Sequence, residues 1–127
     1  MPSSLFISHV YEDRNASDSI RDWAAQGLLG PGVVVTGERR DVRQGGDPAI
    51  RAELGAMIQG AAAVIVLVGS DTHNRSWVDY EVNYALSQRR KVVVVRIPRT
   101  TGAAPTSVRS LPITAFEPGA LRRALGN

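Results

Sequence analysis

Residues 61–81 read AAAVIVLVGSDTHNRSWVDYE, and this stretch decides the fold of the chain. Its apolar run ends at a Gly-Ser pair, a polar loop follows, and a helix then opens at Trp77 and carries Glu81 one turn further on. The run over residues 62–68 is apolar throughout, which is typical of a parallel strand that helices cover on both faces. Open sheets of this kind bind ligands at the carboxyl ends of their strands. The stretch therefore predicts that Trp77 and Glu81 lie beside a ligand-binding crevice.

Further strand-like and helix-like segments alternate on both sides of this stretch. Strands are also expected at residues 5–8, 33–35, 91–97 and, as a short edge strand, 111–116. Helices are expected at residues 17–29, from Pro48 onward, from Trp77 to about Arg89 with Ser76 as its cap, and at residues 118–125. This alternation predicts an α/β fold, an open parallel sheet flanked by helices with right-handed crossovers. No repeat or linker divides residues 1–127, which we take as a single domain.

Apolar residues at helical spacing mark the faces that should point inward. In the first two helices these are Ile20, Trp23, Ala24, Leu28, Ile50, Leu54, Met57 and Ile58. In the helix from Trp77, the stripe expected to be buried consists of Val78, Val82, Ala85 and Leu86. An adjacent stripe, expected at the margin of the core, consists of Trp77, Glu81, Tyr84 and Gln88. Partial burial beside an aromatic ring would raise the pKa of Glu81, as at many functional carboxylates. An alternative stays open here, in which Glu81 is a surface residue paired with an arginine.

Composition narrows the possible functions. The chain has no cysteine, which excludes disulfides, thiolate catalysis and cysteine-ligated zinc and fits a reducing, cytoplasmic location. There is no secretory signal, and the apolar runs are too short to span a bilayer, so no membrane association is expected. The net charge is +3, and the basic residues, all arginine except Lys91, are scattered along the chain, with pairs at Arg39/Arg40, Arg89/Arg90 and Arg122/Arg123. No nucleic-acid partner is expected, because such binders more often show a basic stripe interleaved with aromatic residues.

Several common catalytic sites are missing. The sequence contains no dinucleotide-binding GxGxxG after the first strand, no phosphate-binding P-loop and no GxSxG nucleophile elbow. His9 and His73 are the only histidines and have no paired ligands, so we expect neither a metal site nor a bound cofactor. Glu12, Asp13 and Asp71 lie several residues beyond the strand ends at which the acidic pocket of a receiver domain would form.

Two segments resemble a known family. The opening LFISHVYEDRNASDSIRDW, residues 5–23, resembles the FISxxxED opening of Toll/interleukin-1 receptor (TIR) domains. The segment VIVLVGSDTHNRSWVDYEVNYAL, residues 64–86, is similar to their third strand, loop and following helix. It looks most like the bacterial TIR-like proteins of the Thoeris antiphage-defence type, in which a GS…WVxYE pattern recurs. The resemblance covers about residues 5–97 and implies a TIR-like, flavodoxin-like sheet.

The resemblance also implies an activity and site residues. Many bacterial and plant TIR domains cleave the nicotinamide–ribose bond of NAD, and those of the Thoeris type release a cyclised or conjugated ADP-ribose signal. By this likeness Glu81 is the catalytic glutamate, and Trp77 is the aromatic residue beside it. Ser8 and His9 match positions that line the nucleotide pocket. NAD would be the substrate and not a bound cofactor.

The resemblance suggests partners and a further loop. Family members often complete their sites by TIR–TIR self-assembly, and a separate effector would sense the nucleotide product. Residues 36–46 take the place of the family's mobile loop. The arginines of this loop that could approach phosphate are Arg39, Arg40 and Arg43.

Two other functions remain open. The chain could be a catalytically silent TIR-like interaction module, for which the loop at residues 36–46 would matter and Glu81 would not. It could also be an enzyme like the nucleoside deoxyribosyltransferases, which share the sheet and a catalytic glutamate. Turnover of deoxynucleosides in place of NAD would identify that activity.

Overall fold

The computed structural model describes residues 3–36 and 48–127, and among these it describes all side chains except those of residues 48–51. The strands are β1 (Ser4–Ser8), β2 (Val34–Thr36), β3 (Ala63–Val68), β4 (Lys91–Arg96) and β5 (Ile113–Thr114). The α-helices are α1 (Arg14–Ala25), α2 (Pro48–Gly60), α3 (Ser76–Ser87) and α4 (Pro118–Leu125). Short 3-10 turns are η1 (Tyr11–Asp13), η2 (Thr72–Asn74) and η3 (Thr106–Val108).

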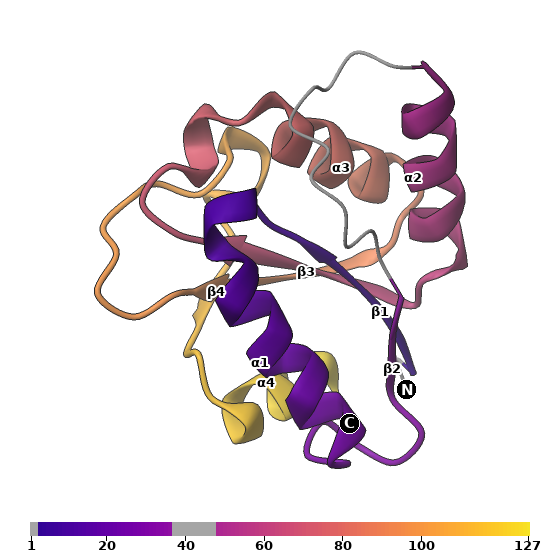
Figure 1. Ribbon diagram of the computed structural model, residues 1–127, viewed down its shortest axis with the longest axis vertical. Helices are drawn as coiled ribbons and strands as arrows, with labels where there is room; N and C mark the ends of the chain where they lie inside the picture. Colours follow the sequence, from indigo (N-terminus) through magenta and orange to yellow (C-terminus); the bar gives the residue numbers. More distant parts are fainter. Residues whose placement is uncertain (1–2, 37–47) are drawn as a thin grey trace.

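The five strands form one sheet in the order β2-β1-β3-β4-β5, and every neighbouring pair is parallel (Figure 1). The chain runs from β1 outward to β2, crosses back to β3 on the other side of β1, and then continues to β4 and β5. The direction of winding therefore reverses between β1 and β3. Ligands bind at such a switch point in open α/β sheets, outside the carboxyl ends of the strands.

Two apolar layers hold helices against the two faces of the sheet. On one face α1 and α4 pack through Ile20, Leu121 and Leu125, all fully buried against alternate residues of the strands. On the other face α2 and α3 pack through residues such as Leu54 and Val82. Strand β3 lies at the centre and is buried at all six positions, as its unbroken apolar run predicts. The fold class predicted from the sequence is confirmed.

Strand and helix predictions are confirmed to within a few residues, with three corrections. The first helix begins at Arg14 and ends at Ala25, earlier than expected, because η1 leads directly into it; Leu28 lies beyond its end and is 41% exposed. Ser76 is the first residue of α3 and not its cap, since the cap position belongs to Arg75. Leu86 was expected in the buried stripe of α3 but is 40% exposed.

The expected loop at residues 36–46 lies outside the described residues apart from Thr36, the last residue of β2. The same holds for the predictions about Arg39, Arg40 and Arg43, and for the side chain of Ile50. Of the other inward residues predicted for α2, Leu54 and Ile58 are fully buried and Met57 is partly buried against the same core.

Candidate functional site

A serine and a glutamate meet at the switch point of the sheet. Ser8 is the last residue of β1, and its side chain points to the face that α3 covers, because side chains alternate along a strand. The Ser8 hydroxyl donates a hydrogen bond of 2.6 Å to Oε1 of Glu81 in α3. Ser8 is fully buried and Glu81 is only 5% exposed. The two residues predicted for substrate binding and catalysis are thus in direct contact.

Burial controls the protonation of Glu81. Loss of water around the carboxyl raises the pKa of Glu81 from 4.5 to about 8, and the hydrogen bond from Ser8 acts in the opposite direction. The sequence predicted Glu81 at the margin of the core, but the structure buries all but 5% of it. Carboxylates with strongly raised pKa values are typical of functional sites. At neutral pH this group holds its proton most of the time, and a nearby positive charge would release it.

Aromatic rings follow one another along α3 beside the glutamate. Trp77 begins this row one turn before Glu81 and is 7% exposed. The Tyr80 ring meets it edge-on at 5.9 Å between ring centroids, and the Tyr84 ring lies 6.2 Å from Tyr80. Trp77 is therefore a rigid apolar wall next to the carboxyl, as expected from its place in the WVDYE motif.

His9 lies apart from this group. Its Nδ1 is 3.4 Å from the carbonyl oxygen of Ile7, and the charged groups that influence it are Asp18 and Arg21 of α1. Burial lowers the pKa of His9 below its ordinary 6.5. The structure thus brings Ser8, Trp77 and Glu81 together, whereas His9 belongs to the surroundings of α1.

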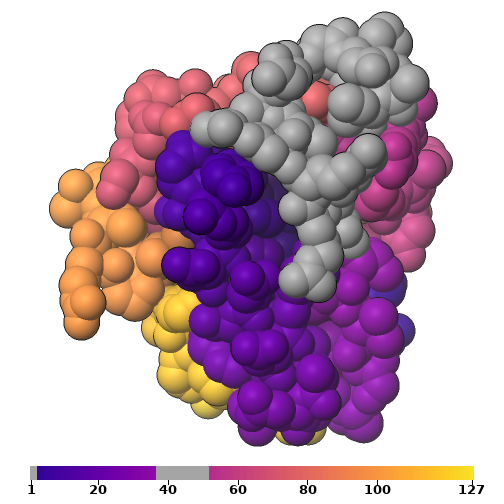
Figure 2. Space-filling view, in the orientation of Figure 1, coloured from indigo at the N-terminus to yellow at the C-terminus, as the bar shows by residue number. Residues whose placement is uncertain are grey.

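The loops at the carboxyl end of β3 are tightly packed. A Cβ atom on Gly69 would collide with the Asp13 carboxylate, and a Cβ on Gly102 would collide with the carbonyl oxygens of Gly69 and Ser70. The loop after β4 therefore lies directly on the loop after β3, and Figure 2 shows the orange surface of the former beside the rose surface of the latter. Burial and the neighbouring Glu12 raise the pKa of Asp13.

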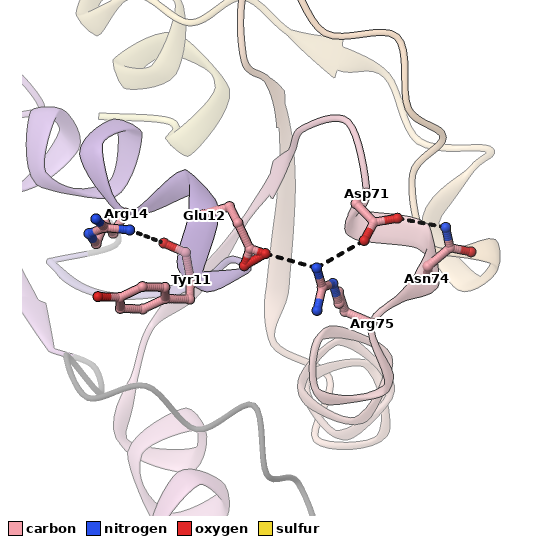
Figure 3. A network of polar contacts seen from close by, with 6 residues as sticks. All are labelled: Tyr11, Glu12, Arg14, Asp71, Asn74 and Arg75. Atoms are coloured by element: carbon pink, nitrogen blue, oxygen red, sulfur yellow. Dashed lines mark hydrogen bonds and ion pairs between the residues drawn. The ribbon is translucent and has the colours of Figure 1, made fainter.

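A polar network joins the start of α3 to the segment after β1 (Figure 3). Nη2 of Arg75 lies 2.8 Å from Oε2 of Glu12 and 3.0 Å from Oδ2 of Asp71. Asn74 donates a 2.6 Å hydrogen bond to Asp71, and this bond is the main reason that the pKa of Asp71 is lowered. The sequence analysis did not identify Arg75. The available signal was topological, since Glu12 and Asp71 follow the carboxyl ends of adjacent strands.

The described residues contain no group of three or more histidine, cysteine, aspartate or glutamate side chains arranged to hold a metal ion. Nor does any helix in this part of the chain have the length and apolar character needed to cross a membrane.

The parallel sheet of order β2-β1-β3-β4-β5, flanked by helices, is the fold of solved TIR-domain structures. The TIR domain of the Toll-related receptor TRR-2 from Hydra magnipapillata is similar with a TM-score of 0.64 and 17% identity, over 87% of this chain and 82% of that one. A prokaryotic SEFIR domain is similar with a TM-score of 0.59 and 18% identity, over 99% and 94%. A structure of the RPS4 and RRS1 TIR domain heterodimer gives a TM-score of 0.52 and 17% identity, over 94% and 89%. At these identities the likeness concerns the fold alone.

The family follows from the sequence itself. Residues 6–102 match the model of the family described as "Thoeris protein ThsB, TIR-like domain". The chain belongs to this family. A search of curated protein sequences finds no match. The matched residues contain both segments on which the resemblance rested, and they include Ser8, Trp77 and Glu81.

Proposed function

We propose that this protein cleaves the nicotinamide–ribose bond of NAD and that Glu81 is its catalytic residue. The observation that carries the proposal is the buried Ser8–Glu81 pair at the switch point, in a chain of the ThsB TIR-like family. A buried carboxyl beside an aromatic wall suits a reaction in which positive charge develops on a sugar.

The chemistry follows from the charges of the substrate. The bond between C1′ of the ribose and N1 of the nicotinamide ring breaks, and its electron pair leaves with neutral nicotinamide. The ribose becomes oxocarbenium-like, and the Glu81 carboxylate stabilises this charge and accepts a hydrogen bond from a ribose hydroxyl. The positive charge of the bound nicotinamide ring favours the ionised form of Glu81. Trp77 packs beside the sugar or the ring, and Ser8 holds the orientation of the carboxylate.

The acceptor at C1′ determines the product. Attack by water gives ADP-ribose and releases a proton, attack by a nucleophile of the same molecule gives a cyclic ADP-ribose, and a second metabolite gives a conjugate. We propose a cyclic or conjugated signal that a separate effector of antiphage defence senses. Self-assembly through TIR–TIR contacts would complete the active form, and the structural likeness to a TIR domain heterodimer supports this part of the proposal.

The structural likeness to the RPS4 and RRS1 TIR domain heterodimer also favours one alternative function, a catalytically silent interaction module. In that case the raised pKa of Glu81 would have no catalytic use, and loss of the side chain would not affect partner binding.

The test is to incubate the purified protein with NAD, dilute and under crowding, and to measure nicotinamide release by chromatography and mass spectrometry. Glu81→Gln keeps the shape of the side chain and should reduce release at least about a hundredfold. Glu53→Gln on the exposed side of α2 is the matched control and should retain full activity. Near-normal release from Glu81→Gln contradicts the assignment of Glu81, and no release from the wild type in either condition favours the interaction module.

A further inference from the structure

Arg75 occupies the junction of three chain segments. It is the residue directly before α3, and its carbonyl oxygen accepts the backbone N–H of Asp79 in the first turn. Its guanidinium contacts Glu12, from the turn that follows β1, and Asp71, from the loop that follows β3. Figure 3 shows the guanidinium between the two carboxylates, with the helix below it.

Two of these three segments adjoin the buried pair, since Ser8 ends β1 and Glu81 lies in α3. Glu12 comes four residues after Ser8, and Arg75 comes six residues before Glu81. The hydrogen bond between Ser8 and Glu81 therefore joins β1 to α3 inside the protein, and the bridge from Glu12 to Arg75 joins the same two segments at the surface. A shift of the helix start away from β1 would open both connections.

We propose that Arg75 is a positioning residue, which holds the start of α3 against the segment after β1 and so keeps Glu81 closed onto Ser8. This proposal rests on the proposed function of Glu81 for its importance in catalysis, but not for its geometry.

The exposure of the ion pair between Arg75 and Glu12 indicates that Arg75 positions the helix and adds little to the stability of the fold. The side chains of Arg75 and Glu12 are 34% and 47% exposed, and ion pairs with this much exposure to water contribute little to folding. Removing the pair should therefore leave the protein folded. Both contacts are made by Nη2, one nitrogen of the rigid, planar guanidinium, whereas the ammonium of a lysine is a point charge at the end of a flexible stem. Arg75→Lys should thus preserve the charge but only part of the positioning.

The direction in which the pKa of Glu81 moves when Arg75 is replaced distinguishes a positioning role from a purely electrostatic one. Among the described residues, burial and the Ser8 hydrogen bond set the pKa of Glu81, and the charged groups around Arg75 are Glu12, Asp13 and Asp71. Loss of a nearby positive charge by itself would raise the pKa of a carboxyl. If Arg75 holds the helix closed, its loss admits water to Glu81 and lowers the pKa instead.

The experiment follows the side-chain carboxyl of Glu81 by ¹³C NMR in the full chain labelled at glutamate, with the signal assigned from Glu81→Gln. In Arg75→Gln the titration midpoint of Glu81 should fall by up to about 0.7 pH unit, the most that the loss of an exposed ion pair can produce, and in Arg75→Lys by less. Arg14→Gln is the matched control, because Arg14 carries the same charge and, among the described residues, makes its polar and ring contacts with Tyr11 of the preceding turn. It should leave the midpoint unchanged or slightly raised.

An unchanged or raised midpoint in Arg75→Gln would overturn the proposal. Nicotinamide release provides a second readout, with kcat expected to fall about tenfold in Arg75→Gln and to recover in part in Arg75→Lys. If the wild type does not cleave NAD but the midpoint falls as expected, the proposed function fails and the positioning role stands.

Discussion

Ser8 donates its hydroxyl hydrogen to Oε1 of Glu81 at 2.6 Å, across the boundary between β1 and α3. The bond satisfies one oxygen of a carboxyl that the rest of the protein shields from water. It also favours the ionised form, against the larger effect of burial. The pair therefore fixes both the orientation and the charge of the candidate catalytic group, and several predictions depend on it.

The pH dependence of catalysis should report the charge of Glu81. Since the ionised form stabilises the developing positive charge, kcat/KM for NAD should rise with pH and level off above about 8, the pKa of Glu81 in the free protein. Ser8→Ala removes a hydrogen bond that lowers this pKa, so the rising limb should move to higher pH. The control Ser19→Ala removes a hydrogen bond to the carbonyl oxygen of Asn15 within α1 and should leave the pH profile in place. A limb that moves to lower pH in Ser8→Ala would contradict this account.

Glu81 should make the protein less stable as the pH rises. Its pKa is about 8 when folded and 4.5 in its ordinary environment, so the folded state binds the proton more tightly between these values. The free energy of unfolding should then fall with pH across this window, by up to about 1.4 kcal/mol per pH unit. Glu81→Gln carries no charge and should be more stable than the wild type at pH 8, with little difference at pH 4.5. Chemical denaturation at the two pH values measures this, and equal stability of the two proteins at pH 8 would argue against a buried carboxylate.

The contact of the two loops above β3 requires a glycine at position 102. A Cβ there would meet backbone carbonyl oxygens of Gly69 and Ser70, which cannot move without displacing the loop. Gly102→Ala should reduce the free energy of unfolding by about 1 to 3 kcal/mol. Gly60→Ala is the control, because nothing lies within 4 Å of the added atom at the end of α2, and it should be neutral or slightly stabilising. Equal denaturation midpoints for the two variants would show that the loop moves without cost.

The end of α3 offers a stabilising substitution. Arg89 has a φ of 56°, and the N–H groups of Arg89 and Arg90 bond to the carbonyls of Leu86 and Ala85, as in a Schellman motif. This position favours glycine, because a side chain is strained in the left-handed region. Arg89→Gly should raise the free energy of unfolding by about 1 kcal/mol, whereas Arg89→Ala, which also removes the charge but keeps a Cβ, should not. Thermal unfolding of both variants separates the backbone effect from the loss of charge.

The spacing of apolar residues and the positions of glycine and proline predicted most of the fold. The unbroken apolar run before Gly69 predicted the central strand, and the proline at position 118 predicted the start of α4. The error at Leu28 arose because the helical pattern continues in sequence beyond the point at which the chain turns at residues 26–30. The predicted burial of Leu86 was wrong for a related reason. A helical wheel gives the direction of a side chain but not the width of the surface that covers it.

The candidate site was predicted less completely. The motif around Trp77 identified Glu81, and the strand exit identified Ser8, but only the sheet register brings the two together. The separation of His9 from them follows from the alternation of side chains at the end of β1, which the sequence analysis did not apply to neighbouring residues. Arg75 was missed because its partners are far away in the sequence, and no local pattern encodes a contact between loops of adjacent strands.

The 73 residues that separate Ser8 from Glu81 have a consequence for the synthesis of the protein. A growing chain exposes the serine long before the helix with the glutamate has been made, and the two can meet only when β3 has joined β1. The buried pair therefore forms with the closure of the sheet and not with any local segment. A nascent or partly unfolded chain carries the same residues without the pair, so the proposed NAD cleavage would begin only when folding is complete.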